Sequence, residues 1–109
     1  MFSKKYKITK KDDFNKIYKS GSVFYSEHLK VFILPNNLNY NRFSVVISKK
    51  VSAKAVMRNR IKRKIKNSLI DFDKNLNPSR DVIIIPSFEI ATLKTALLKE
   101  KFEKLLKRI

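Results

Sequence analysis

The segment VMRNRIKRKIKNSLI, residues 56 to 70, concentrates arginine and lysine side chains and contains no acidic residue. Arg58, Arg60 and Arg63 fall within a few positions of one another. A guanidinium group binds phosphate through two parallel hydrogen bonds and stacks on nucleobases, which the ammonium group of lysine does less well. Residue types and spacing in this segment therefore favour binding to a phosphate-rich polyanion.

The charge of the whole chain points to the same kind of partner. The net charge is +17, from 26 Lys and Arg against 9 Asp and Glu, and no acidic residue occurs between Glu27 and Asp71. Lysine outnumbers arginine, so compositional bias with lysines solvating the surface is the competing interpretation. A block of like charge repels itself unless a partner binds it, however. We interpret the block as a nucleic-acid surface, with an anionic membrane surface as the second choice.

The side chains offer little chemistry for bond cleavage. A nuclease acting alone needs a carboxylate cluster for metal ions or a His and Lys acid-base pair. His28, the single histidine, lies in an expected strand, where a structural role is more common than catalysis. Asp71 and Asp73 follow a helix, and metal ligation there is the less favoured interpretation. The single glycine, Gly21, rules out the phosphate loops GxxxxGK[ST] and GxGxxG.

Length and composition predict one folded domain, residues 1–109. The 43% apolar content suits a globule, and 109 residues suffice for a single core of two packed layers. No run reaches the roughly 18 to 20 apolar residues of a membrane span, and the basic start MFSKKYKITKK lacks the apolar region of a signal peptide. From these two features we expect a cytoplasmic protein with no membrane partner, and the absence of cysteine is compatible with a reducing compartment.

The elements that must position these residues follow from hydrophobic periodicity. A helix is expected over 10–20, with a Thr9 and Asp12 capping box and Gly21 just past its end. Strands are expected at 22–26, 28–34 and 43–48, and the third is so continuously apolar that we predict a central position for it. A long helix over 52–70, a strand over 81–86 and a C-terminal amphipathic helix complete an αβββαβα order. The predicted fold class is α+β, a four-stranded sheet with helices packed on it.

The long helix is expected to have two basic edges. With residues roughly 100 degrees apart, Met57, Ile61 and Ile65 form the stripe facing the core. One edge then carries Arg58, Asn59 and Lys62, with Lys66 beyond them. The opposite edge carries Arg60, Arg63 and Lys64. Such a helix could hold two polyanionic surfaces at once.

Aromatic residues suggest a groove for single-stranded RNA. Phe14 and Tyr18 lie one helical turn apart, and Phe32 lies in a strand that could face them. Unstacked bases bind aromatic faces, so rings bordering a basic cleft would hold a single strand. From spacing alone, a plain core position for these rings is the stronger alternative.

The segment KKVSAKAVMRNRIKRKIKNSL resembles the signature of the bacterial ribonuclease P protein subunit, including its Arg-Asn-Arg core. The segments KKDDFNKIYKSG, SEHLKVFIL, FSVVISKK and DVIIIP are similar to the family's other elements, so the resemblance covers nearly the whole chain. It implies a left-handed βαβ crossover, which connectivity rules alone would not predict because about 98% of such crossovers are right-handed.

The resemblance also implies an activity and two RNA partners. Family members bind a catalytic RNA, and the holoenzyme removes the 5′ leader of precursor tRNA by Mg²⁺-dependent hydrolysis. The RNA supplies the chemistry and holds most of the Mg²⁺, so the resemblance implies no catalytic residue in the protein and no required protein partner. By the family pattern the leader-binding residues are Phe14, Tyr18, Phe32, Arg58, Asn59 and Lys62. Those expected to contact the catalytic RNA are Lys49, Lys50, Lys54, Arg60, Arg63, Lys64 and Lys66.

Departures from the family pattern occur at Ser44, where many members have glycine, and at Ser52 and Ala53, which replace a frequent glycine-containing turn. They leave the local backbone path open. The alternative function is a structural RNA-binding protein of the ribosomal kind, which would not discriminate between RNAs by a leader. A basic helix lying on an anionic membrane is a third and weaker hypothesis, because the sheet needs the same apolar stripe.

Overall fold

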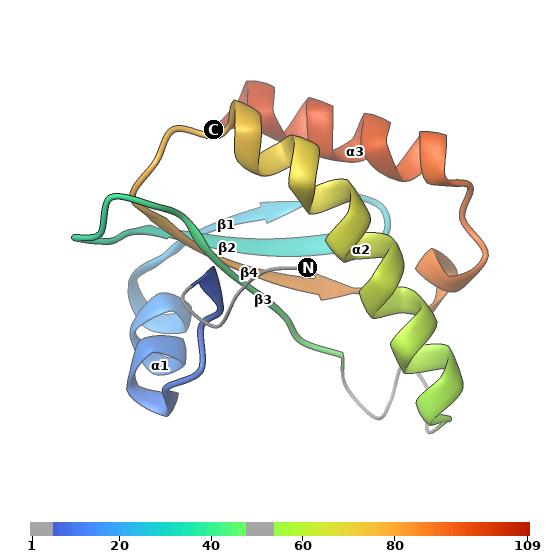
Figure 1. Cartoon of the computed structure of the whole chain (residues 1–109), viewed down its shortest axis with the longest axis horizontal. Helices are drawn as coiled ribbons and strands as arrows, with labels where there is room; N and C mark the ends of the chain where they lie inside the picture. Colours follow the sequence, from blue (N-terminus) through green and yellow to red (C-terminus); the bar gives the residue numbers. More distant parts are fainter. Residues whose placement is uncertain (1–5, 48–53) are drawn as a thin grey trace.

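The computed structural model describes residues 6–47 and 54–109, and four strands form one mixed sheet in it (Figure 1). The elements occur in the predicted αβββαβα order, with one additional 3₁₀ turn. They are α1 (Lys11–Ser20), β1 (Ser22–Tyr25), β2 (Leu29–Pro35), β3 (Arg42–Val45), α2 (Ala55–Asn75), β4 (Arg80–Pro86), η2 (Phe88–Ala91) and α3 (Thr95–Arg108). The α+β class and the four-stranded sheet are therefore confirmed.

The strand order is β1-β2-β4-β3, so the prediction that the third strand is central was wrong. β2 and β4 occupy the middle, while β3 is the last strand and pairs with β4 in parallel. Its apolar run has another cause. Phe43 and Val45 pack toward α2, Val46 packs toward the opposite face, and the N-terminal segment covers the outer edge through a bridge between Lys7 and Phe43. β3 is nevertheless less buried than the central strands, because Phe43 is its only fully buried residue whereas most residues of β2 and β4 are buried.

The connection from β3 through α2 to β4 is a βαβ crossover between parallel neighbours. In Figure 1, α2 lies above the sheet, the two strands run from left to right, and β3 is nearer to the viewer than β4. That arrangement is left-handed, as the resemblance implied and against the usual preference.

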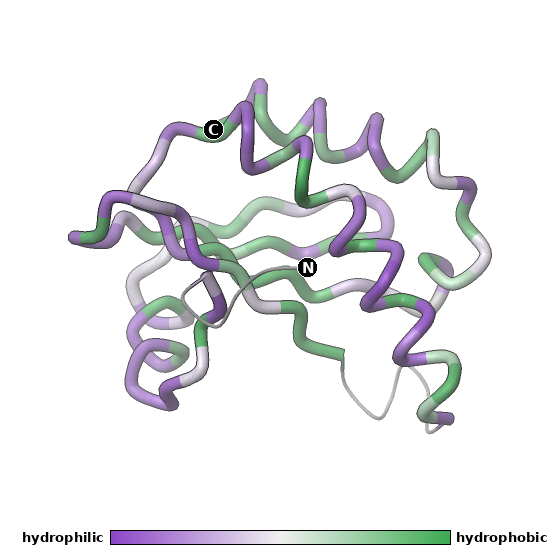
Figure 2. Tube along the Cα trace, viewed as in Figure 1, coloured by the Kyte–Doolittle hydropathy of each residue, from purple (hydrophilic) through white to green (hydrophobic). Residues whose placement is uncertain are grey.

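The two faces of the sheet are covered unequally. α2 and α3 pack on one face, where Ile61, Ile65 and Leu69 are fully buried, so the predicted core stripe is confirmed. Of the helices in the described ranges, α1 alone packs on the other face, where its buried Ile17 lies in one cluster with Phe32 and Ile83 of the sheet and Ile8 of the N-terminal segment. Figure 2 shows the same pattern, with strands that are mainly hydrophobic and helices that alternate along their length. Much of the α1 face therefore remains open for contacts with a partner.

The helix ends differ from the sequence-based prediction. α1 is preceded by Lys10 without a side-chain cap, so the Thr9 and Asp12 capping box is not formed. Gly21 follows α1 at φ −74°, outside the left-handed region, but a Cβ there would lie 2.5 Å from the carbonyl oxygen of Ile17. Close approach of backbone, and not a positive φ, is therefore what requires glycine at this turn.

α2 continues past its predicted end at residue 70 to Asn75. Phe72 extends the buried stripe by one more turn, and the side-chain amide of Asn41 donates to Oδ1 of Asp73 at 2.9 Å. Of the helices in the described part of the chain, none has the length and apolar character needed to cross a membrane.

Candidate nucleic-acid interface

Two rings of α1 and one ring of β2 meet on the α1 face of the sheet. The centroids of Phe14 and Tyr18 are 6.4 Å apart with nearly parallel rings, and Tyr18 meets Phe32 edge-on at 5.0 Å. Phe32 is buried, whereas Tyr18 is 39% exposed, and burial raises the pKa of its phenol. The predicted proximity of these residues, hereafter the aromatic cluster, is confirmed. The cluster is neither pure core nor pure surface, because Tyr18 leaves one side of the rings accessible.

A polar contact attaches α1 to the sheet beside this cluster. The guanidinium of Arg42, at the start of β3, donates to Oδ2 of Asp13 at 3.3 Å and to both carboxylate oxygens of Asp81. The amide of Asn36 also donates to Asp81, at 2.8 Å. These contacts fix the helix turn that carries Phe14.

Arg58, Asn59 and Lys62 share one edge of α2, as predicted. Together with Val45 and Ile47 they line a hollow of about 230 Å³ between the helix and the end of β3. Val45, Ile47 and Ala55 are its apolar lining residues, and Arg58 and Lys62 are its basic ones. The two basic side chains can bind phosphate oxygens there.

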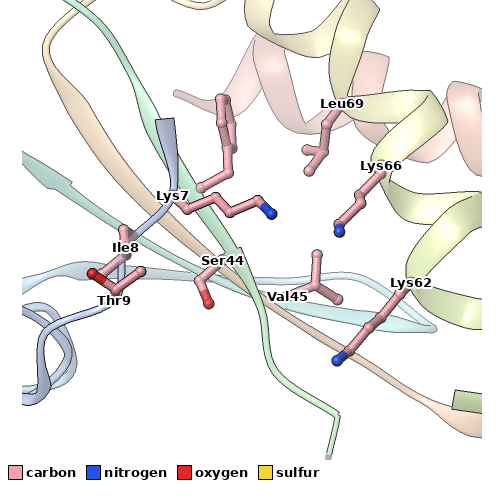
Figure 3. Close-up of a pocket in the computed structure, with 9 residues that line it drawn as sticks. Lys7, Ile8, Thr9, Ser44, Val45, Lys62, Lys66 and Leu69 are labelled. Carbon is pink, nitrogen blue, oxygen red and sulfur yellow. The ribbon is translucent and has the colours of Figure 1, made fainter. Parts of the chain in front are cut away.

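A second hollow, of about 160 Å³, continues along the same edge of α2 (Figure 3). In Figure 3, Lys7 and Lys66 extend their ammonium groups toward each other across it, and Lys62 lies on the α2 side near Val45. Among the described residues no carboxylate pairs with any of these three lysines. Lys66, which the family pattern assigned to the catalytic RNA, thus lies on the edge assigned to the leader. Lys7 was missed, and only the basic N-terminal segment hinted at it.

The opposite edge of α2 has a different character. Arg60 and Arg63 are exposed and, within the described ranges, take part in no ion pair. Lys64, which was predicted to lie beside them, is half-buried and donates from Nζ to the carbonyl oxygens of Ala91 and Leu93 at 2.8 and 2.9 Å. Its ammonium therefore holds the segment between η2 and α3 against α2.

The remaining predicted positions divide into described and undescribed residues. Lys54 immediately precedes α2 and is exposed. Ser44 pairs with Ile83 in the parallel ladder and lines the second hollow, which Lys7, Lys62 and Lys66 also line. Lys49 and Lys50, together with Ser52 and Ala53, lie outside the described residues.

The aromatic cluster and the basic edge of α2 are separate sites on the protein. Figure 1 shows α1 and the N-terminal end of α2 at opposite sides of the view, with the sheet between them. Any single ligand that touches both must therefore reach from one side of the molecule to the other.

The carboxylates that were considered as metal ligands have other partners. Asp71 pairs with Lys99 at 3.7 Å, and Asp73 accepts from Asn41. Within residues 6–47 and 54–109, no three His, Cys, Asp or Glu side chains are grouped so that they could hold a metal ion.

Comparison with known proteins links this surface to one family. The family model "Ribonuclease P" matches residues 2–109. The chain is 34% identical over 102 residues to the ribonuclease P protein component of Caldanaerobacter subterraneus subsp. tengcongensis, covering 94% of this chain and 87% of that protein. It is 38% identical over 79 residues to the component from Clostridioides difficile, covering 72% of this chain and 68% of that protein.

Solved structures show the same fold. The RNase P protein of Staphylococcus aureus superposes with a TM-score of 0.80 at 29% identity, covering 94% of this chain and 93% of that one. The RNase P protein of Thermotoga maritima gives a TM-score of 0.83 at 26% identity, covering 94% of this chain and 96% of that one. The likeness therefore extends over both the sequence and the complete sheet-and-helix arrangement.

Proposed function

The chain belongs to the ribonuclease P protein family and is thus a protein subunit of ribonuclease P in tRNA 5′ processing. From the geometry described above, we propose that its surface is divided between two RNA molecules. The aromatic cluster and one edge of α2 bind the single-stranded 5′ leader of precursor tRNA. The opposite edge of α2, with Arg60 and Arg63, binds the catalytic RNA subunit. The protein acts in the cytoplasm and brings the two RNAs together.

The observation that carries the leader assignment is the partial exposure of the aromatic cluster. Tyr18 is 39% exposed and is backed by Phe14 and Phe32, so a ring face is available in a fixed orientation. Only unpaired bases can stack on such a face, and each stacked base contributes about 1 to 3 kcal/mol. A leader is single-stranded where the body of tRNA is paired, so this site would favour the precursor over the product.

The basic edge of α2 supports the same assignment. Lys7, Lys62 and Lys66 converge on one hollow, and Arg58 and Asn59 border the next one along the helix. Successive phosphates of an extended strand could occupy such a row of positive groups. The separation of this row from the aromatic cluster suits a strand of several nucleotides and not a compact ligand.

The other edge of α2 suits a large structured RNA. Arg60 and Arg63 project from a helix whose opposite stripe is fixed in the core by Ile61 and Ile65. Guanidinium groups on a rigid helix bind phosphates bidentately with little loss of side-chain freedom. Lys54, which is exposed, immediately precedes the same helix and would extend this surface.

Bond cleavage is assigned to the RNA, with Mg²⁺ as its cofactor. The described residues bring together no group of three metal ligands, and Asp71 and Asp73 are engaged by Lys99 and Asn41. When bound to the RNA, Mg²⁺ would activate water and stabilise the leaving oxygen. The contribution of this chain is to bind and orient the leader beside that centre.

Binding of precursor and mature tRNA to the reconstituted holoenzyme tests the leader assignment. Tyr18→Ala removes the exposed ring, and we expect about tenfold weaker binding of precursor, equivalent to about 1.4 kcal/mol. Tyr18→Phe keeps the ring and is the matched control, with binding close to that of the unmodified chain. Mature tRNA should bind all three proteins alike. Equal losses for precursor and mature tRNA would remove the leader site from this account.

A further inference from the structure

The sheet face that carries α1 has a second exposed group of side chains next to the aromatic cluster. Tyr25 on β1 pairs directly with Lys30 on β2, so their side chains leave the sheet on the same side. Lys30 is two residues from Phe32 on the same strand and therefore shares its face. Tyr25 and Lys30 thus extend the surface on which Phe14, Tyr18 and Phe32 lie.

The contacts between these side chains are continuous. The Nζ atom of Lys30 lies 5.1 Å from the centroid of the Phe32 ring and 5.5 Å from that of Tyr25. Phe32 in turn meets Tyr18 at 5.0 Å. One lysine thus lies between two aromatic positions, which gives the alternation of ring and positive charge that a nucleic-acid strand requires of its binding surface.

This part of the face is open. Tyr25 is 61% exposed and its neighbour Val23 is 38% exposed, although both belong to a strand. α2 and α3 pack on the opposite face, where Phe24 points. A single exposed tyrosine on a strand carries no argument by itself, but Tyr25 lies next to Lys30, which also contacts Phe32 of the aromatic cluster.

The position of Tyr25 is fixed from the other side of the sheet. Arg108 of α3 donates from Nη1 to the carbonyl oxygen of Tyr25 at 2.7 Å, and its guanidinium lies 5.7 Å from the ring centroid of Phe24. The end of β1 is therefore attached to α3. A ligand stacking on Tyr25 would lose little free energy in ordering the strand beneath it.

The charge of Lys30 is available to an anion. Among the described residues no carboxylate forms an ion pair with it, and the acidic residue closest in sequence, Glu27, pairs with Lys101 and His28. The cation-π contacts with Tyr25 and Phe32 orient the ammonium without neutralising it. A phosphate could therefore bind Lys30 while bases occupy the rings on either side.

We propose that Tyr25 and Lys30 form an additional leader-binding position, in which a base stacks on Tyr25 and Lys30 binds a phosphate between that base and the aromatic cluster. This inference rests on the proposed leader function of the cluster. It extends the binding track from α1 across β2 to β1. It also predicts that the protein distinguishes precursors by leader length.

The test uses the reconstituted holoenzyme and precursors whose leaders grow one nucleotide at a time, with mature tRNA as the leaderless reference. Tyr25→Ala and Lys30→Gln should bind mature tRNA like the unmodified protein. They should lose affinity, by about tenfold for Tyr25→Ala, only once the leader is long enough to reach this position. The length at which the loss begins should differ from that for Tyr18→Ala, because two positions along one strand are reached at different lengths.

Two matched variants control the experiment. Tyr25→Phe keeps the ring and should retain affinity at every leader length. Lys104→Gln removes a 72% exposed lysine of α3, on the other side of the sheet, and should not show a leader-length threshold. Thermal unfolding of each variant separates lost binding from lost folding.

Two outcomes would overturn the proposal. Tyr25→Ala and Lys30→Gln proteins that match the unmodified chain at every leader length would show that no RNA binds at this position. An equal loss for all substrates, mature tRNA included, would assign these residues to a contact with the catalytic RNA. Tyr18→Ala tests the proposed function separately, since its effect does not depend on Tyr25 or Lys30.

Discussion

Arg42 and Asp81 face each other on the parallel strands β3 and β4, and the guanidinium donates two hydrogen bonds to the carboxylate. The Nε–Oδ1 distance is 2.8 Å and the Nη2–Oδ2 distance is 2.6 Å. Hydrogen bonding to Asp81 raises the pKa of Arg42, and this outweighs the desolvation that opposes it. The third contact of this guanidinium, with Asp13, connects the pair to α1.

Arg42→Ala is expected to destabilise the protein strongly. It would leave Asp81, whose side chain is only 7% exposed, without its charge partner. Loss of one partner of a largely buried ion pair lowers the free energy of unfolding by about 3 kcal/mol. Urea denaturation measures this loss. Arg80→Ala, on the neighbouring residue, is the control and should cost well under half as much, because the Arg80 guanidinium makes only an exposed hydrogen bond to the carbonyl of Asn77.

Asp13→Asn is expected to affect leader binding more than stability. It removes the charge attraction between α1 and Arg42 and leaves the Arg42–Asp81 pair intact. The side chain of Asp13 is 30% exposed, so the stability loss should be below about 1 kcal/mol. Since the same helix carries Phe14 and Tyr18, precursor affinity should fall while affinity for mature tRNA is kept. In a double-mutant cycle with Tyr18→Ala the two losses should be less than additive. Strict additivity would show that Asp13 does not position the cluster.

The long helix could be predicted well because the signal for it, the spacing of its apolar residues, is local in the sequence. Ile61, Ile65 and Leu69 recur at a helical period over several turns, and period alone determines which side faces the sheet. The order of the strands is not local. β3 has the composition of a central strand, but its apolar residues are used to contact α2 and the N-terminal segment from an edge position, and only Phe43 is fully buried.

The same distinction explains the outcome at the binding surface. Arg58, Asn59 and Lys62 were placed correctly on one edge of α2, because angular position on a helix follows from spacing. Lys64 was placed on the correct edge, but its partners Ala91 and Leu93 come from a distant segment that spacing does not reveal. Lys7 likewise reaches its hollow through a tertiary contact of the N-terminal segment.

Lys64→Gln and Arg63→Gln should give opposite results although the residues are adjacent. Lys64 donates hydrogen bonds to two carbonyl oxygens just before the start of α3, so its loss should lower the free energy of unfolding by about 1 to 3 kcal/mol. Arg63 is exposed and unpaired among the described residues, so its loss should leave stability unchanged and weaken assembly with the catalytic RNA. Thermal unfolding and filter binding of the catalytic RNA separate the two. A stable Lys64→Gln protein with impaired assembly would make Lys64 an RNA-binding residue.

Tyr18 should make the free energy of unfolding fall as the pH rises through the alkaline range in which its phenol loses its proton. Burial raises the pKa of its phenol, so the folded chain holds this proton more tightly than the unfolded chain does. The associated stability is fully present below the ordinary tyrosine range and is lost as the pH rises through the raised pKa. Urea denaturation at increasing alkaline pH should therefore show a shallower decline for Tyr18→Phe than for the unmodified chain. Identical declines would indicate that the phenol titrates normally.

Binding of the catalytic RNA should be steeply dependent on salt, and the steepness should fall when α2 loses its outer arginines. Each phosphate neutralised contributes about 0.7 to 0.9 to the slope of log K against log salt concentration. Arg60→Ala combined with Arg63→Ala should lower that slope for the catalytic RNA by about two such contributions. The matched pair Lys62→Ala and Lys66→Ala, on the other edge, should leave that slope nearly unchanged and instead flatten the salt dependence of leader binding. If both pairs reduced the slope for the catalytic RNA equally, the two edges of α2 would serve one RNA and not two.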